Sequence, residues 1–141
     1  MLKKIQIFLI FCIVAGTLSA NDWIITIKGI EYEKKGNLLL AVYFGEEGYM
    51  DRSKIIYKES IPVSSDEIQF TVKDLTPGEY SFAILHDEDG DNKMKTGAIM
   101  PKEGFAFSGK KQPAGRPPKY KNAYVTLDSE VVESTAQMKY Y

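Results

Sequence analysis

The sequence contains little of the side-chain chemistry on which metal centres and nucleophilic enzymes usually depend. Cys12 is its one cysteine and His86 its one histidine among 141 residues. A single cysteine allows no internal disulfide and no thiolate metal site, and a single histidine makes a poor zinc site. The glycines match neither a phosphate-binding loop nor a dinucleotide-binding fingerprint. These absences point away from a disulfide, a zinc site and a nucleotide-binding loop.

The first 20 residues have the composition of a secretory signal peptide. A short basic start is followed by an apolar run over residues 5–15 and by the small residues of a cleavage site. The run is too short to cross a membrane comfortably as a helix. We expect cleavage after Ala20, with Ser19 as the alternative, and a periplasmic or extracellular location for residues 21–141, without a transmembrane helix.

The rest of the chain has the pattern of β-strands separated by Gly- and Pro-containing turns. Residues 68–72 alternate between apolar and polar side chains, as half-buried strands do, and no segment keeps a helical apolar spacing for three turns. About seven short strands predict one antiparallel β-sandwich domain over residues 21–141, with a short helical turn at 45–53. The expected strands are residues 23–27, 38–44, 54–57, 68–72, 80–85, 124–127 and 136–140.

A long connection at residues 87–122 interrupts this series of short turns. It contains five glycines and four prolines, together with Phe105, Phe107 and Tyr120. Connections of this length in compact domains are usually functional or disordered, and the aromatic side chains argue against disorder. We expect one long ordered loop folded against the sandwich. In it, Phe105 and Phe107 either pin the loop to the core or stack on a ligand.

The same loop concentrates positive charge. Residues 93–121 contain eight basic residues and one acidic residue, a net charge of +7. Such a segment attracts polyanions, so a cell-envelope glycan or protein is the expected partner, and Arg116 is a candidate ligand-binding residue. Alternatively, the segment docks onto the acidic surface of its own molecule. Nucleic acid is not an expected partner, because the chain is predicted to be exported and has no recognised binding motif.

An acidic cluster begins the long loop. Asp87, Asp89 and Asp91 have the spacing of positions 1, 3 and 5 of a calcium-binding loop, in which the carbonyl of Lys93 would occupy position 7. Carboxylates this close together repel one another unless a cation or a basic partner lies among them. The cluster therefore predicts either a bound calcium ion or a solvated acidic turn.

The calcium pattern is incomplete at two positions. Asn92 stands at position 6, where calcium loops have Gly, and Ala98 stands at position 12, where they have a bidentate Glu. A closing carboxylate would have to come from elsewhere, and Glu103 is the nearest candidate.

Four segments of the chain, residues 77–80, 86–91, 101–108 and 115–124, form a recognisable series of motifs. Taken together, they resemble the bacterial domain-of-unknown-function family 2141. The resemblance implies an exported bacterial protein with an immunoglobulin-like or transthyretin-like β-sandwich, and it implies no established activity. The chain departs from the family's motifs at Asn92 and Lys95, where the family has Gly and Asp, and at Arg116, which interrupts a Gly-Pro-Pro segment. The final Tyr140 and Tyr141 are also compatible with the resemblance.

The hypothesis that these features favour is an exported, non-catalytic binding or structural module of the bacterial cell envelope, with an unknown ligand. The alternative is a small periplasmic hydrolase that uses His86 and neighbouring carboxylates, with Ser108 as a nucleophile within hydrogen-bond reach. The candidate ligand-binding residues are His86, Glu103, Phe105, Phe107, Ser108 and Arg116, and the candidate calcium ligands are Asp87, Asp89, Asp91 and Lys93.

Overall fold

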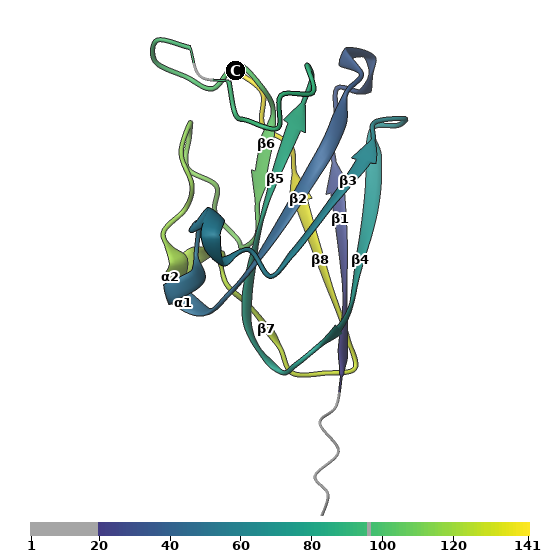
Figure 1. The fold of residues 1–141 in the computed structure, drawn as a ribbon, viewed down its shortest axis with the longest axis vertical. Coiled ribbons are helices and arrows are strands. Elements are labelled where there is room, and N and C mark those ends of the chain that lie inside the picture. Colours follow the sequence, from purple (N-terminus) through teal and green to yellow (C-terminus); the bar gives the residue numbers. More distant parts are fainter. Residues whose placement is uncertain (1–19, 96) are drawn as a thin grey trace, which may run out of the picture.

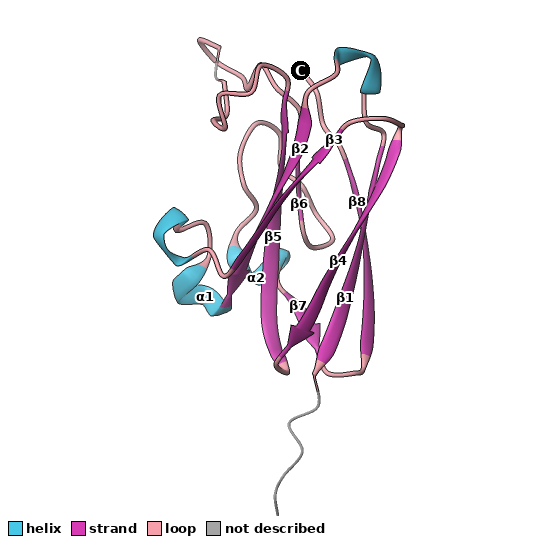
Figure 2. Cartoon of the chain, turned by 45° about the vertical axis from the view of Figure 1, so that its right-hand side comes forward, coloured by secondary structure: helices cyan, strands magenta, loops and turns pink. Residues whose placement is uncertain are grey.

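The computed structural model describes residues 20–95 and 97–141, and in this part of the chain it is all-β, with eight strands in two sheets (Figures 1 and 2). All but the last residue of the expected signal peptide lies outside the described residues. The strands are β1 (Asn21–Lys28), β2 (Asn37–Phe44), β3 (Tyr57–Pro62), β4 (Glu67–Leu75), β5 (Gly78–Asp87), β6 (Phe105–Phe107), β7 (Val125–Leu127) and β8 (Val131–Gln137).

Four short helices join the strands within the described residues. No helix of the described residues is long and apolar enough to cross a membrane. The helical turn expected at 45–53 forms as two separate pieces, since α1 ends at Gly48 and a 3-10 turn begins at Arg52. The helices are η1 (Tyr32–Lys34), α1 (Gly45–Gly48), η2 (Arg52–Lys54) and α2 (Tyr120–Ala123).

The smaller sheet has the strand order β4-β1-β8 and the larger sheet has the order β3-β2-β5-β6, with β7 also paired to β5. All pairings are antiparallel except that of β1 with β8, which is parallel and differs from the expected antiparallel arrangement. After β7 the chain crosses to the smaller sheet near the start of β1, where the Asp22 N–H donates to the Glu130 carbonyl at 2.8 Å. The last strand therefore runs in the same direction as β1.

The two sheets share one hydrophobic core. Alternate residues of β1 point inward, and the Trp23 ring lies 5.4 Å from the ring of Phe82 on the opposite sheet. Burial on this scale is the main stabilising contribution in a chain without a disulfide. The largest buried side chains of this core are Trp23, Ile25, Ile27, Leu38, Leu40, Phe70, Phe82, Ile84 and Leu127.

The larger sheet is apolar on its outer face as well. In β2, Leu39 and Ala41 alternate with the core residues and so point away from the smaller sheet. The long loop after β5 folds back over this outer face. It contributes β6 to the edge of the sheet, so part of the expected loop is a strand.

Candidate functional site

The single histidine is a buried structural residue in this fold. His86 is fully buried, with Nε2 2.5 Å from the carbonyl oxygen of Lys35 and Nδ1 2.7 Å from the hydroxyl of Tyr140. A carbonyl oxygen only accepts, so Nε2 donates to Lys35. The Tyr140 hydroxyl accepts the N–H of Glu31, which leaves its proton to donate to Nδ1. Neither ring nitrogen is left to act on a substrate.

Ser108 is also committed to the fold. Its hydroxyl accepts the backbone N–H of Phe82 at 2.8 Å, and its own N–H donates to the Phe82 carbonyl at 3.0 Å, which extends the pairing of β6 with β5. Phe82 and His86 are four residues apart on one strand, or about 13 Å. The serine and the histidine are therefore not within hydrogen-bond reach of each other.

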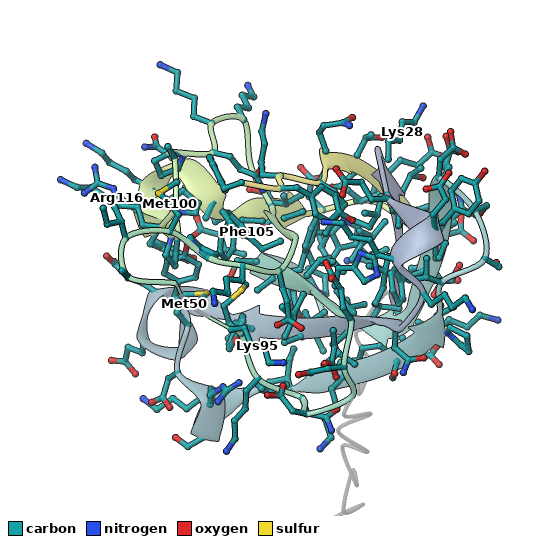
Figure 3. All side chains as sticks on the ribbon, turned by 90° about the horizontal axis from the view of Figure 1, so that it is seen from above. Lys28, Met50, Lys95, Met100, Phe105 and Arg116 are labelled. Carbon is teal, nitrogen blue, oxygen red and sulfur yellow. The ribbon has the colours of Figure 1, made fainter. Side chains whose placement is uncertain are left out.

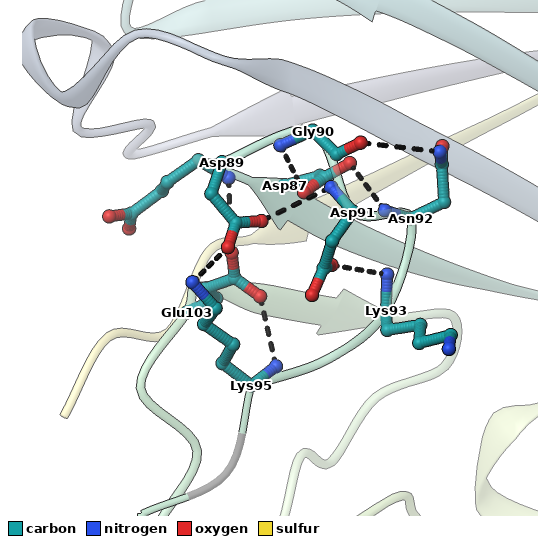
Figure 4. A network of polar contacts seen from close by, with 9 residues as sticks. Asp87, Asp89, Gly90, Asp91, Asn92, Lys93, Lys95 and Glu103 are labelled. Atoms are coloured by element: carbon teal, nitrogen blue, oxygen red, sulfur yellow. Dashed lines mark hydrogen bonds and ion pairs between the residues drawn. The ribbon is translucent and has the colours of Figure 1, made fainter.

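The three aspartates of the acidic turn hold its backbone in place (Figure 4). The buried Asp87 accepts N–H groups from Gly90 at 2.9 Å and from Asn92 at 3.0 Å, one on each carboxylate oxygen. Asn92 adopts the left-handed conformation, with φ at 58°, which Asn tolerates better than most residues. The Lys93 N–H donates to Asp91 at 2.8 Å.

Glu103 fastens a later part of the loop to the same turn. This buried carboxylate accepts the N–H of Glu88 at 3.1 Å on one oxygen and the N–H of Lys95 at 3.0 Å on the other. The Lys95 ammonium contacts the carboxylate of Asp89, and this hydrogen bond lowers the pKa of Asp89 and raises that of Lys95. A cation of the chain itself thus lies at the acidic cluster.

The same cluster has a donor set that suits calcium. One carboxylate oxygen each from Asp87, Asp89 and Asp91 lies within 4.8 Å of the other two. Calcium prefers such oxygen ligands. The structure therefore brings together the three predicted carboxylates, while Lys93 joins them through its backbone N–H.

A cavity of about 910 Å³ lies on the outer face of the larger sheet, beneath the long loop. Its floor consists of apolar residues in register across β2, β5 and β6. One row is Leu39, Leu85 and Phe105, and the next is Ala41, Ala83 and Phe107.

The shape of this floor follows from residue size. Ala41 and Ala83 lie directly opposite each other, and side chains of such a pair share one face of the sheet. Two methyl groups fill far less space than the neighbouring pair of Leu39 and Leu85. The strands thus form a hollow in the middle of the sheet.

The walls of the cavity come from three other parts of the chain. Met50 follows α1, Met94 and Pro101 belong to the long loop, and all three line the space. In Figure 3, Met50, Met100 and Arg116 gather on the side of the molecule away from Lys28. The charged residues of the lining are Arg52, Lys58, Glu59 and Arg116.

Two tyrosines fix the far end of the long loop. The Tyr49 hydroxyl donates to the Pro118 carbonyl at 2.6 Å, and the Tyr120 hydroxyl donates to the Glu79 carboxylate at 2.8 Å. The two tyrosine rings are in contact, with centroids 5.6 Å apart. Burial raises the pKa of Tyr49 to about 12.

The structure divides the predicted ligand-binding residues into two groups. Phe105, Phe107 and Arg116 all line the cavity, whereas His86, Glu103 and Ser108 are buried elsewhere. The outward residues of β2 and β5 also line the cavity and were not among the residues predicted from the sequence. The signal for β2 was the unbroken apolar run of residues 38–44, because a strand that is buried on both faces has apolar residues at consecutive positions.

Comparison with known proteins gives one finding of similarity. A family model described as "Uncharacterized protein conserved in bacteria (DUF2141)" matches residues 25–135. No curated protein and no solved structure matches the chain.

Proposed function

We propose that this chain, which belongs to the DUF2141 family of bacterial proteins as its motifs predicted, is an exported, non-catalytic binding module of the cell envelope. In this proposal its ligand is a small molecule whose apolar part is held in the cavity beneath the long loop. The observation that carries the proposal is the cavity itself, whose volume of about 910 Å³ is that of a ligand pocket.

The composition of the lining favours binding over hydrolysis. Among the described residues that line the cavity there is no histidine and no cysteine, and Glu59 is the one carboxylate. Hydrolytic sites need a nucleophile with its base or a pair of carboxylates. Glu59 already accepts the hydroxyl of Tyr57 at 2.8 Å, and His86 is enclosed by its own two partners.

The envelope location rests on the signal-peptide pattern of residues 1–20 and on the surface of the long loop. Seven of the eight basic residues in 93–121 are exposed and form no salt bridge with another described residue. An exposed cationic segment supports an anionic envelope glycan or protein as a neighbour. We also propose that the two-sheet fold is of the immunoglobulin-like or transthyretin-like type.

Calcium at the acidic turn is the second part of the proposal. The three clustered aspartates support it, and Lys95 would have to release Asp89 when the ion binds. Because Lys95 competes for the same carboxylates, we expect weak binding, of the order of 0.1–1 mM as in extracellular calcium modules.

The test of the cavity uses a neutral apolar dye. The full chain is expressed in a bacterium and purified from the periplasmic fraction, and its amino-terminal sequence reports cleavage after Ala20 or Ser19. Titration with N-phenyl-1-naphthylamine should give a saturable rise in fluorescence at one site per chain. Ala83→Trp fills the hollow in the floor and should abolish this rise.

Thr71→Trp is the matched control, because it adds the same side chain to an exposed position of β4 on the other sheet. It should bind the dye as the parent protein does. Thermal unfolding of both variants confirms that they are folded. The binding proposal fails if the parent protein shows no saturable binding, or if the folded Ala83→Trp variant binds as well as the control.

A further inference from the structure

Three cationic side chains surround the cavity. Arg52 lies in η2, Lys58 in β3 and Arg116 in the long loop, so three separate parts of the chain each contribute a cation to the lining of the same cavity. All three are exposed, and none forms a salt bridge with another described residue. Against them the lining has the single carboxylate of Glu59, which leaves a net charge of +2.

These cations lie beside an apolar surface, which strengthens their effect on a bound anion. The field of a charge is screened less next to a low-dielectric wall than in open water. A guanidinium also presents a planar fork of donors that fits a carboxylate or a phosphate group. Arg52 and Arg116 therefore provide two donor groups of the kind that recognise an anionic head.

The floor of the cavity suits a hydrocarbon chain. Together with Lys58 on β3, it crosses four strands, a width of about 14 Å at the usual strand spacing. Lys58 lies opposite Ala41 in register, so the apolar row through Ala83 to Phe107 has a cation at its β3 end.

The methionine walls fit the same kind of ligand. Met50 and Met94 have flexible thioether side chains, which adapt to apolar surfaces of varied shape. A glycan placed here would instead lose hydration at its hydroxyl groups against the apolar floor, which is unfavourable without replacement hydrogen bonds.

We infer that the ligand is a single-chain anionic amphiphile, of which a fatty acid is the simplest example. Its hydrocarbon chain lies over Ala41 and Ala83, and its anionic head is held by Arg52, Lys58 and Arg116. This inference rests on the proposed function, because it specifies the chemistry of the ligand in the same cavity.

The test compares three ligands that share one chain and differ in their head groups. Dodecanoate, dodecanol and dodecylammonium are each titrated against the dye-loaded protein below their aggregation concentrations. We expect dodecanoate to displace the dye at the lowest concentration and dodecylammonium at the highest. The advantage of dodecanoate should shrink as sodium chloride is added, because salt screens the head-group interaction.

Charge-removing variants locate the head group. Arg52→Gln, Lys58→Gln and Arg116→Gln should each weaken dodecanoate binding about 2–5-fold, the range of a partly exposed ion pair. Each should leave dodecanol binding unchanged. Lys73→Gln, on the exposed face of β4, is the matched control and should change neither.

The outcomes separate this inference from the proposed function. If the dye binds saturably but dodecanoate and dodecanol displace it equally, the anionic ligand is refuted while the binding module stands. If the dye does not bind at all, both fail. If no amphiphile binds and the protein is a dimer that Ala83→Trp dissociates, the cavity is an interface between copies and the inference is overturned.

Discussion

Replacement of Tyr140 by Phe tests how the carboxyl-terminal segment fixes the buried histidine. The tyrosine hydroxyl lies 2.7 Å from Nδ1 of His86 and accepts the backbone N–H of Glu31 at 3.1 Å. Phenylalanine removes both hydrogen bonds but keeps the ring, which packs edge to face on the imidazole with ring centroids 5.8 Å apart. The Glu31 N–H is exposed and turns to water, whereas the buried Nδ1 is left without a donor, at a cost of about 1–3 kcal/mol.

For a domain of this size, such a loss lowers the midpoint of thermal unfolding by roughly 4–12 °C, which circular dichroism measures. Tyr141→Phe is the matched control, because the Tyr141 side chain is 54% exposed and its hydroxyl has no hydrogen bond to a described residue. This control should stay within about 0.5 kcal/mol of the parent protein. Equal midpoints for the two variants would refute the structural role assigned to the Tyr140 hydroxyl.

Two further predictions concern charge. Calcium at about 10 mM should increase the free energy of unfolding by about 1.4–2.7 kcal/mol relative to EDTA, for a site of the expected affinity, and so raise the unfolding midpoint. Lys95→Asp should enlarge this rise. Magnesium is the control, and the absence of a calcium-specific rise in both proteins would contradict the site. The raised pKa of Tyr49, about 12, means that the folded state favours the neutral phenol. The stability that this phenol contributes is therefore complete below pH 10 and is lost as the pH rises from 10 to about 12. Midpoints measured across this range should fall less in Tyr49→Phe than in the parent protein, and identical pH profiles would contradict this.

The strands with a strong local pattern could be predicted from the sequence. Residues 68–72 alternate between apolar and polar side chains and lie inside β4. The last strand was expected at 136–140 and instead spans Val131–Gln137. It is a polar strand at a sheet edge, and its Ser134 hydroxyl accepts the indole N–H of Trp23 from 111 residues away. No local pattern of residues reports such a partner.

The candidate site was predictable only where single residues stood out by their type. Phe105, Phe107 and Arg116 stood out by type, and all three line the cavity. The hydrogen-bond partners of His86 were not predictable, since they lie 51 and 54 residues away along the chain. The cavity itself depends on Ala41 and Ala83 meeting in register across two strands, and alanine carries no signal of its own.

The acidic turn and the cavity are connected through the long loop. At one end of the loop, the carboxylates of Asp87 and Glu103 accept four backbone N–H groups. At the other end, the Tyr49 hydroxyl donates to the Pro118 carbonyl and the Tyr120 hydroxyl donates to the Glu79 carboxylate. Most of these contacts lie outside the cavity, so the loop is positioned over the sheet before any ligand arrives. Binding then avoids the entropy loss of ordering a loop, which is the main advantage of a preformed site. If the cavity binds the ligand proposed above, the carboxylates that resemble a metal site contribute to that binding by holding the wall of the cavity in place.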